Sequence, residues 1–298
     1  MTREAPRRNG DPRAARERLA PEAEASIHIA LLPGESSMLR IAISAAIVAA
    51  LSGLALAPAR ATAQDLTLDQ ATQMLRSSDH DEVQTAIQSI GLLGSPRGVE
   101  PLAARIRDGL APDLLESAID TLTVLGRAEA GPVLFELVTH RRPEVRLRAV
   151  QAIAATRPRG ADRALVSALS DSSAEVRSAA ATALGDLGAV SAVESLFLAL
   201  DRGVPEAGPA LGKVVRAEHV GRVLEYLGRL PFSQMQGVLE EMLRRRDLPS
   251  RSRLDVVARL GELATPEVRT FLSEWASAQP ANDPVRRSAE DVVARIAQ

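Results

Sequence analysis

The 298-residue chain contains no cysteine, so a disulfide framework, a cysteine-ligated metal and a thiol nucleophile are all excluded. Only 2% of its residues are aromatic, although 46% are hydrophobic. The core must therefore be built from alanine, leucine and valine, which suits helices packed on helices better than a β-sandwich. Lysine occurs once, at Lys213, so arginine supplies nearly all of the positive charge.

Residues 38–63 have the order of a secretory signal peptide. A short positive start leads into an apolar run over residues 41–57, and Ala61 and Ala63 form a small-x-small cleavage pattern. We expect cleavage after Ala63 and a mature protein in the periplasm or outside the cell. The alternative is an uncleaved anchor, because the 17-residue run is at the short edge of what a spanning helix needs.

Residues 1–37 precede this complete signal. An export signal normally begins a chain, so we expect Met38 to be the true start and residues 1–37 to be an upstream start artefact. The first 63 residues hold eight arginines and six acidic residues, so 28 basic and 32 acidic residues remain, for a net charge of −4. Nucleic-acid binders show a basic footprint, so we expect no nucleic-acid partner. Without a lipidation cysteine, we also expect no stable membrane anchor after cleavage.

Three stretches of the chain align without a gap when they are shifted by 31 residues. A fixed period of this length predicts a stacked repeat array, which usually offers long surfaces to other macromolecules. Four columns of aliphatic residues carry the alignment, namely Leu114, Val145 and Val176; Leu122, Ile153 and Leu184; Leu134, Leu165 and Leu196; and Val138, Leu169 and Leu200.

The repeat unit is clearest over residues 174–200. Apolar residues recur at helical spacing from Val176 to Leu187, Gly188 suits a left-handed residue after the helix, and residues 192–200 form a second apolar stripe. The unit is therefore predicted to be two antiparallel helices joined by a tight turn. Each such pair is apolar on two sides, so neighbouring pairs must stack.

Other copies of the unit cover residues 112–138 and 143–169, and a slightly shorter copy covers 81–106. Residues 67–75 are predicted to form an N-terminal capping helix. Before the clearest copy, the polar residues 171–173 offer side-chain oxygens to the free backbone donors of the helix start.

These units resemble HEAT repeats, particularly the short bacterial HEAT-like kind. The resemblance implies a right-handed, all-α solenoid of stacked antiparallel helix pairs, clear over about 79–200 and degenerate over 203–298, whose second helices line a concave face. It also implies that Arg146 and Arg177 tie adjacent repeats together, and that the turn at Arg157, which replaces a glycine, differs. The segments that carry it are Pro-Glu-Val-Arg at 143–146, Ala-Val-Gln-Ala-Ile at 149–153, Ala-Glu-Val-Arg-Ser-Ala-Ala at 174–180 and Leu-Gly-Asp-Leu-Gly at 184–188.

The pattern breaks at residues 203–211, where Pro209 falls inside the expected helix. A proline inside a helix costs about 3 kcal/mol, so this helix should be short or kinked. Either the helix starts later, at Pro209, or the chain bends there. Beyond the break, helices are predicted at 220–230 and 233–246, the latter without an obvious partner, then a pair at 253–263 and 266–275, and a closing helix at 284–297.

Residues suited to catalysis or metal binding are sparse. His80, His140 and His219 are predicted near separate turns, and only residues 79–82 gather several potential ligands. That cluster is either a capped helix start, where acids are favoured, or part of a metal site completed by other elements. HEAT-type deoxyhypusine hydroxylases hold metal through His-Glu pairs, which these histidines lack. We expect no catalytic residue, cofactor or metal site.

The sequence therefore favours an exported, non-catalytic scaffold that binds protein partners through the concave face. The alternatives are a HEAT-like protein associated with an enzyme or with chromophore or metal handling, and a purely structural envelope protein. Candidate contacts on the second helices are Glu136, Arg163 and Leu198. Leu198 replaces the polar residues of its column, so it is either an exposed contact or a packed one.

A cluster of arginines around one loop is the other candidate surface, because arginine binds carboxylates and phosphates well. It is either a solvated surface neutralised by nearby acids or a patch for an acidic protein or anionic lipid. The candidate contacts are Arg244, Arg245, Arg246, Arg251 and Arg253, the cluster also includes Arg259, and the acids are Glu240, Glu241, Asp247 and Asp255.

Overall fold

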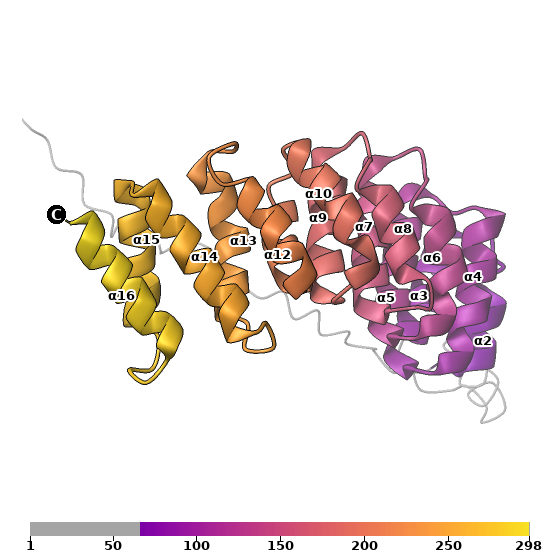
Figure 1. Ribbon diagram of the computed structural model, residues 1–298. Coiled ribbons are helices and arrows are strands. Elements are labelled where there is room, and N and C mark those ends of the chain that lie inside the picture. The colour runs from indigo at the N-terminus through magenta and orange to yellow at the C-terminus, as the bar shows by residue number, and fades with distance from the viewer. Residues whose placement is uncertain (1–65, 298) are drawn as a thin grey trace, which may run out of the picture. The chain divides into compact units, whose positions relative to one another are not determined.

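The computed structural model describes residues 66–297, so the predicted signal peptide at 38–63 and the expected artefact at 1–37 lie outside the described residues. Within 66–297 the chain forms α-helices and short 3₁₀ helices, and no strand occurs in this part of the chain. Figure 1 shows the helices side by side in consecutive layers, from indigo α2 to yellow α16. The predicted solenoid of stacked antiparallel helix pairs is confirmed.

The first helix of each pair packs against the first helix of the next pair, from α3 through to α13. Their bounds are α3 His80–Leu93, α5 Pro112–Leu125, α7 Pro143–Thr156, α9 Ala174–Asp186, α11 Ala207–Val214 and α13 Phe232–Arg244. The second helices are α4 Val99–Asp108, α6 Gly131–Leu137, α8 Ala161–Ala168, α10 Val193–Asp201 and α12 Ala217–Glu225.

The aliphatic columns of the sequence form the continuous core between these layers. Leu122, Ile153 and Leu184, one from each of three first helices, are fully buried. Each such side chain contributes about 1.5–3 kcal/mol when it leaves water, and no single pair could bury its own. Stacking is therefore what stabilises each pair.

The predicted capping helix is α2, Leu68–Met74. Thr67 and Gln70 form a reciprocal capping box, in which the Gln70 N–H donates to the Thr67 hydroxyl at 3.3 Å and the Thr67 N–H donates to the Gln70 side chain at 2.9 Å. Helix α2, with its start held by this capping box, packs against α3 and covers its apolar side.

Helices α3, α5, α7 and α9 are each followed by a residue with positive φ, as the sequence predicts for Gly188 (φ 64°). Helices α11 and α13 end in extended residues instead. The expectation for Arg157 is only half right. Arg157 takes the same left-handed conformation (φ 48°), so the helix end does not change. The link that follows does change, because 3₁₀ helices stand at Pro96–Gly98, Ala128–Ala130 and Val190–Ala192 in the other copies, and residues 158–160 form a turn instead.

The predicted cap of α9 is wrong in its detail. Ser173 is the N-cap, and its side chain makes no capping hydrogen bond. The Asp171 carboxylate instead accepts the Ser173 N–H at 2.8 Å, one residue before the helix, and faces Arg146. The carboxylate is thus used between repeats and not at the helix end.

The break at 203–211 is a short helix with an early start. Helix α11 begins at Ala207, so Pro209 is its third residue, where a backbone N–H would have no partner inside the helix. Pro209 therefore fits the helix, which begins two residues earlier than the predicted start. Ala207 is fully buried at the column position that follows Val176.

Helix α13, predicted to lack an obvious partner, packs closely on α11. Two glycines on α11 make this approach possible. A Cβ on Gly212 would lie 2.7 Å from the carbonyl oxygen of Val238, and one on Gly208 would lie 3.2 Å from that of Gln234. The helix after the break is therefore glycine-rich because the next helix's backbone lies against it.

Beyond the break, α14 (Ser250–Leu263) and α15 (Pro266–Ser277) form the predicted pair, and α16 (Pro284–Ile296) packs against both. Ala264 ends α14 with φ 51°, as glycine ends earlier first helices. Direct contact between α13 and α15 is slight compared with that between α11 and α13. The solenoid is thus loosest between α13 and α15.

Candidate partner-binding surfaces

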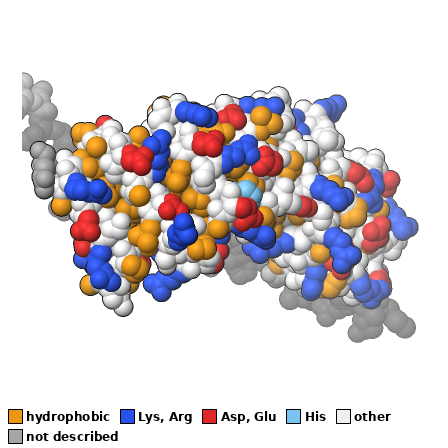
Figure 2. Space-filling view, viewed as in Figure 1, with side chains coloured by type: hydrophobic (Ala, Val, Ile, Leu, Met, Phe, Trp, Pro, Cys, Tyr) orange, Lys and Arg blue, Asp and Glu red, His pale blue; other side chains and the backbone are white. Residues whose placement is uncertain are grey.

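Charges of both signs are interspersed over one face of the solenoid. On the face shown in Figure 2, arginine and acidic side chains alternate along the described residues, and neither sign dominates. Such a surface offers no continuous basic stripe of the kind that binds nucleic acid. Local side-chain arrangement must therefore distinguish one part of this face from another.

On the second helices, the three predicted contacts have different surroundings. Glu136 on α6 is exposed and its carboxylate lies 3.2 Å from the Arg107 guanidinium of α4. Arg163 on α8 is exposed. Leu198 on α10 is 49% exposed, so of the two sequence alternatives the structure supports exposure.

Leu198 lies beside an ordered polar and aromatic cluster. One turn before it on α10 is Glu194, whose carboxylate is 2.6 Å from the Arg222 guanidinium of α12. That guanidinium also lies 4.0 Å from the centre of the Phe197 ring, and Phe197 stacks on Tyr226. The Glu194 bond raises the pKa of Arg222 further, so the cation is permanent. An exposed apolar side chain thus lies one helical turn from the glutamate that holds Arg222.

The predicted arginine cluster is not one surface. Arg253 is buried, with 8% of its surface exposed, and its guanidinium lies 3.7 Å from Asp283, so a partner could not reach it. Arg245 donates to the carbonyl oxygens of Gly212 and Val215 at 3.0 and 2.7 Å, and so caps the C-terminus of α11. The prediction that Arg245 and Arg253 contact a partner is therefore wrong, because both have structural roles.

The rest of the cluster is dispersed. Arg244 pairs with Glu240 and Glu241 of its own helix, as the solvated alternative predicts. Arg246 and Arg251 are exposed. Arg246 lies in the loop after α13 and Arg251 in the first turn of α14, and two separate cations are too few to form the predicted patch.

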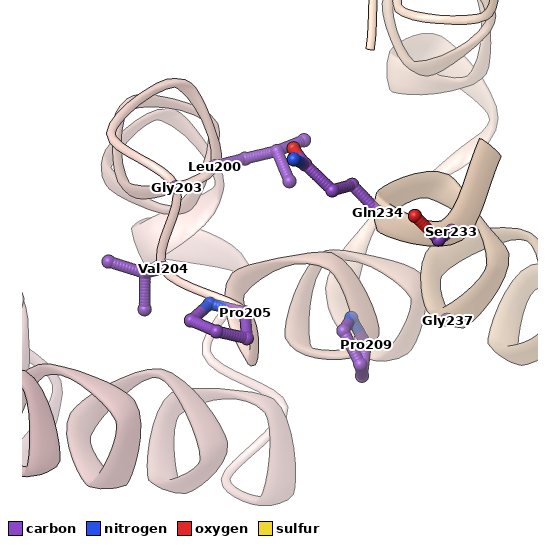
Figure 3. Close-up of a pocket in the computed structure, with 8 residues that line it drawn as sticks. All are labelled: Leu200, Gly203, Val204, Pro205, Pro209, Ser233, Gln234 and Gly237. Atoms are coloured by element: carbon purple, nitrogen blue, oxygen red, sulfur yellow. The ribbon is translucent and has the colours of Figure 1, made fainter. Parts of the chain in front are cut away.

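A small cavity of about 290 Å³ opens where the repeat pattern breaks (Figure 3). Pro205 and Pro209 line it from the chain around the start of α11, and Ser233 and Gln234 line it from the first turn of α13. The Gln234 side chain extends toward Leu200. One wall of the cavity is tightly packed, since a Cβ on Gly237 of α13 would lie 2.7 Å from the Pro209 ring.

A larger groove runs between α13 and α15, and the sequence reasoning missed it. Two adjoining hollows of about 270 and 650 Å³ share Gln236, Phe271 and Glu274 in their walls. The groove is lined by three of the six aromatic residues of the chain, Phe232, Phe271 and Trp275. This gathering of scarce aromatics within 44 residues was the available signal.

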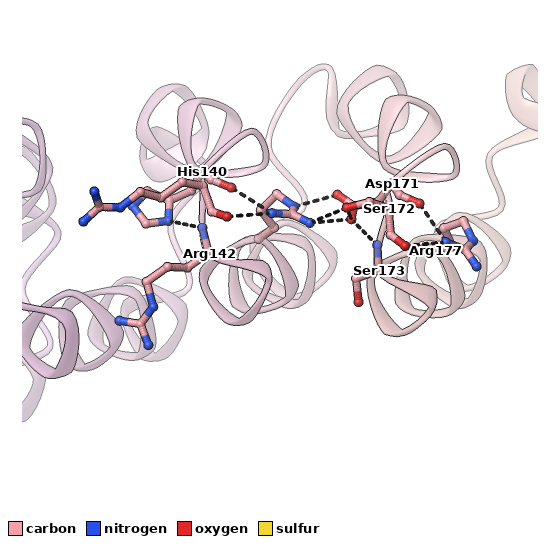
Figure 4. Close-up of polar contacts among 8 residues, drawn as sticks. His140, Arg142, Asp171, Ser172, Ser173 and Arg177 are labelled. Atoms are coloured by element: carbon pink, nitrogen blue, oxygen red, sulfur yellow. Dashed lines mark hydrogen bonds and ion pairs between the residues drawn. The ribbon is translucent and has the colours of Figure 1, made fainter.

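The link between repeats that the resemblance implies is present for Arg146 near the start of α7, whereas Arg177 bonds only to the loop before its own helix (Figure 4). Arg146 donates from Nε and Nη2 to the two oxygens of Asp171, both at 2.7 Å, and from Nη1 to the His140 carbonyl at 3.0 Å. Arg177 in the next helix donates to the carbonyl oxygens of Asp171 and Ser172 at 2.8 and 3.0 Å. The bond from Arg146 lowers the pKa of Asp171.

The histidines serve separate local contacts. His80 lies 2.8 Å from Asp113, and His140 and His219 accept the backbone N–H groups of Arg142 and Arg216 through Nδ1. Asp79 caps α3 by accepting the Glu82 N–H at 3.0 Å, as the capped-start alternative predicts. Within residues 66–297, no group of three His, Asp or Glu side chains is arranged to hold a metal ion.

None of the helices described here has both the length and the apolar character required to cross a bilayer.

Residues 131–207 match the protein family described as HEAT repeats. No curated protein matches the sequence. Among solved structures, the complex of CpcE and CpcF of phycocyanin lyase from Nostoc sp. is 21% identical, covers 82% of this chain and 99% of that chain, and gives a TM-score of 0.43.

Human deoxyhypusine hydroxylase is 20% identical, with 77% of this chain and 96% of that chain covered and a TM-score of 0.37. A designed armadillo repeat protein is 17% identical, with 77% and 100% covered and a TM-score of 0.38. Likenesses at these levels carry no activity over to this chain.

Proposed function

Because residues 131–207 of this chain are HEAT repeats, we propose that the protein is an exported, non-catalytic scaffold that binds a protein partner across its second helices. HEAT-repeat solenoids commonly mediate protein interactions. Their layers present side chains from several consecutive helices on one face, so a partner is held at many points without a deep pocket. The proposal extends this role to an exported protein.

The observation that carries the proposal is the exposure of Leu198 one helical turn from Glu194, the partner of Arg222. Interfaces place apolar anchors and arginines at their energetic centre, surrounded by polar contacts that exclude water. About half of the surface of Leu198 is exposed and available to a partner, and Glu194 holds the Arg222 guanidinium in place over Phe197. A preorganised arginine loses little conformational freedom when a partner binds.

The surrounding second helices extend this contact. Arg163 on α8 occupies the same column as Glu194 on α10, because the two are 31 residues apart. Arg202, at the end of α10, donates to the Ser170 hydroxyl after α8 at 3.0 Å and ties the two repeats together. We therefore place the contact surface over α8, α10 and α12.

Export is proposed from residues 38–63 alone, on the strength of their signal-peptide order. The non-catalytic role is favoured by the histidines, since each is engaged in a local contact at a different helix junction.

The test is affinity capture of the mature form, residues 64–298, from its native envelope, with partners identified by mass spectrometry. Leu198→Asp should abolish capture of the stoichiometric partner and leave the helical melting curve unchanged. Leu92→Asp is the matched control, because Leu92 is an exposed leucine (63%) at the end of α3, far along the array. Equal capture by the wild type and Leu198→Asp would contradict the proposed surface, and mature protein retained in the cytoplasm would contradict export.

A further inference from the structure

The groove between α13 and α15 is lined by aromatic side chains below and carboxylates at the rim. Phe271 and Trp275 are nearly buried, at 6% and 8% exposure, and form its floor together with Phe232, which meets Phe271 edge to face at 5.6 Å. Glu267 and Glu274 of α15 are exposed above them. The groove therefore combines an apolar floor with negative charge at the surface.

Neither rim carboxylate is paired with a cation within the described part of the chain. Glu267 and Glu274 have no ion-pair partner among residues 66–297, whereas Glu240 across the groove is paired with Arg244 at 2.5 Å. The Glu267 N–H and the Thr265 hydroxyl donate to the Glu267 carboxylate and lower its pKa, so that it stays ionised. The groove thus carries a net negative charge that is not compensated from within.

The floor also contains an unused hydrogen-bond donor. The indole Nε1–H of Trp275 is buried and has no acceptor among the protein atoms of residues 66–297. A buried donor without a partner is unfavourable, and an acceptor such as a peptide carbonyl would relieve that cost. Trp275 lines the same hollow as Glu240 and Glu274, so a segment bound there would lie against this ring.

We propose that the groove between α13 and α15 binds an extended peptide segment of a partner protein that carries lysine or arginine side chains. Long basic side chains lay their methylene stems on apolar surface and keep the charged head in water, which matches aromatic rings below and carboxylates above. Charge complementarity thus selects a basic segment and disfavours acidic proteins, nucleic acid and anionic lipid.

The dimensions of the groove set the spacing of the basic residues. Glu267 and Glu274 are seven residues apart on α15, which is roughly 10 Å along a helix axis. In a polyproline II conformation, side chains on one side recur every three residues, about 9 Å apart. The groove therefore fits two basic residues at positions i and i+3.

Trp275 provides a direct reporter, because it is the only tryptophan of the chain. The probe is a short synthetic proline-rich peptide with two arginines at i and i+3, titrated into the mature protein while Trp275 fluorescence is recorded. A saturable change that weakens with added salt is expected, and the same peptide with glutamates in place of the arginines should give none. No saturable change with the arginine peptide would overturn the proposal.

A double variant, Glu267→Gln with Glu274→Gln, should weaken the arginine peptide roughly five- to tenfold, as the loss of two exposed ion pairs implies. The matched control is Glu218→Gln with Glu225→Gln, since these acids are exposed on α12 at the same seven-residue spacing. It should leave affinity unchanged. Equal affinity in the wild type and the Glu267/Glu274 variant would contradict the assignment, whatever the control shows.

Charge reversal gives an independent check that does not depend on loss of binding. Glu267→Lys with Glu274→Lys should prefer the glutamate peptide, and failure to switch preference would overturn the charge argument. The groove stands apart from the second-helix surface at Leu198. A failed peptide titration would leave partner capture through Leu198 intact, and failed capture would leave the peptide result intact, so the two proposals fail separately.

Discussion

The bond between Arg146 and Asp171 is expected to be among the strongest polar contributions to the stability of the array. The two side chains are 12% and 9% exposed and meet in a bidentate pair at 2.7 Å. Asp171→Ala removes both bonds and the acceptor for the Ser173 N–H, while Arg146 keeps its bond to the His140 carbonyl.

The magnitude follows from these contacts. Breaking a buried ion pair by removing one partner costs about 3–5 kcal/mol, and the backbone acceptors that Arg146 retains should offset part of that loss. We expect a loss of about 3 kcal/mol in the free energy of unfolding. The control is Asp186→Ala, which removes the Lys213 pair at 2.8 Å; Asp186 is 54% exposed, so the cost should stay below about 1 kcal/mol.

The assay is urea unfolding of the mature protein followed by circular dichroism, with both variants measured against the wild type. A double-mutant cycle with Arg146→Ala isolates the pair and should give a coupling energy of about 1–3 kcal/mol. The reasoning is refuted if the two aspartate variants differ by less than about 1 kcal/mol, because burial would then confer no advantage on the pair.

Two further predictions concern pH and helix packing. Arg146 lowers the pKa of Asp171 below its ordinary value of 3.8. The stabilisation by Asp171 is therefore fully present above that value and is lost as the pH falls through the folded-state pKa. The difference in unfolding free energy between wild type and Asp171→Asn, measured by urea unfolding, should be constant from about pH 5 to 8 and shrink below about pH 4. Gly212→Ala should destabilise the protein by about 1–3 kcal/mol, since the new Cβ would lie 2.7 Å from the Val238 carbonyl oxygen. Gly221→Ala on α12 has no atom within 4 Å of its Cβ and should be neutral or stabilising in the same measurement; equal effects at the two glycines would contradict the close approach.

Local sequence patterns predicted the structure correctly where a residue contacts its own helix or the equivalent residue of the next repeat. The columns through Leu122, Ile153 and Leu184 predicted the buried core, and Gly188 predicted a left-handed helix end. Arg157 shows the limit, because an arginine can take the same backbone conformation when the surrounding helices fix it. A glycine after a helix predicts the left-handed conformation, but the lack of a glycine does not exclude it.

Sequence proximity misled where charges gather in one segment. Arg244, Arg245 and Arg253 lie within ten residues of one another, yet their contacts differ. Arg244 pairs with its own helix, Arg245 caps α11, and Arg253 is buried near Asp283. A side chain's partner depends on which helices come together around it, and such pairings are not encoded in the order of residues along a loop.

The order of apolar and small residues alone determined that this chain stacks helix pairs, because a 31-residue period leaves each pair with two apolar sides that only neighbours can cover. Only the tertiary structure decided which surfaces have the shape and charge to bind a partner. The groove lies where α13 and α15 make little direct contact, in contrast with the tight contact of α11 with α13. Phe232 of α13 meets Phe271 of α15 there, and such a contact between helices depends on how they pack and not on the order of residues along the chain.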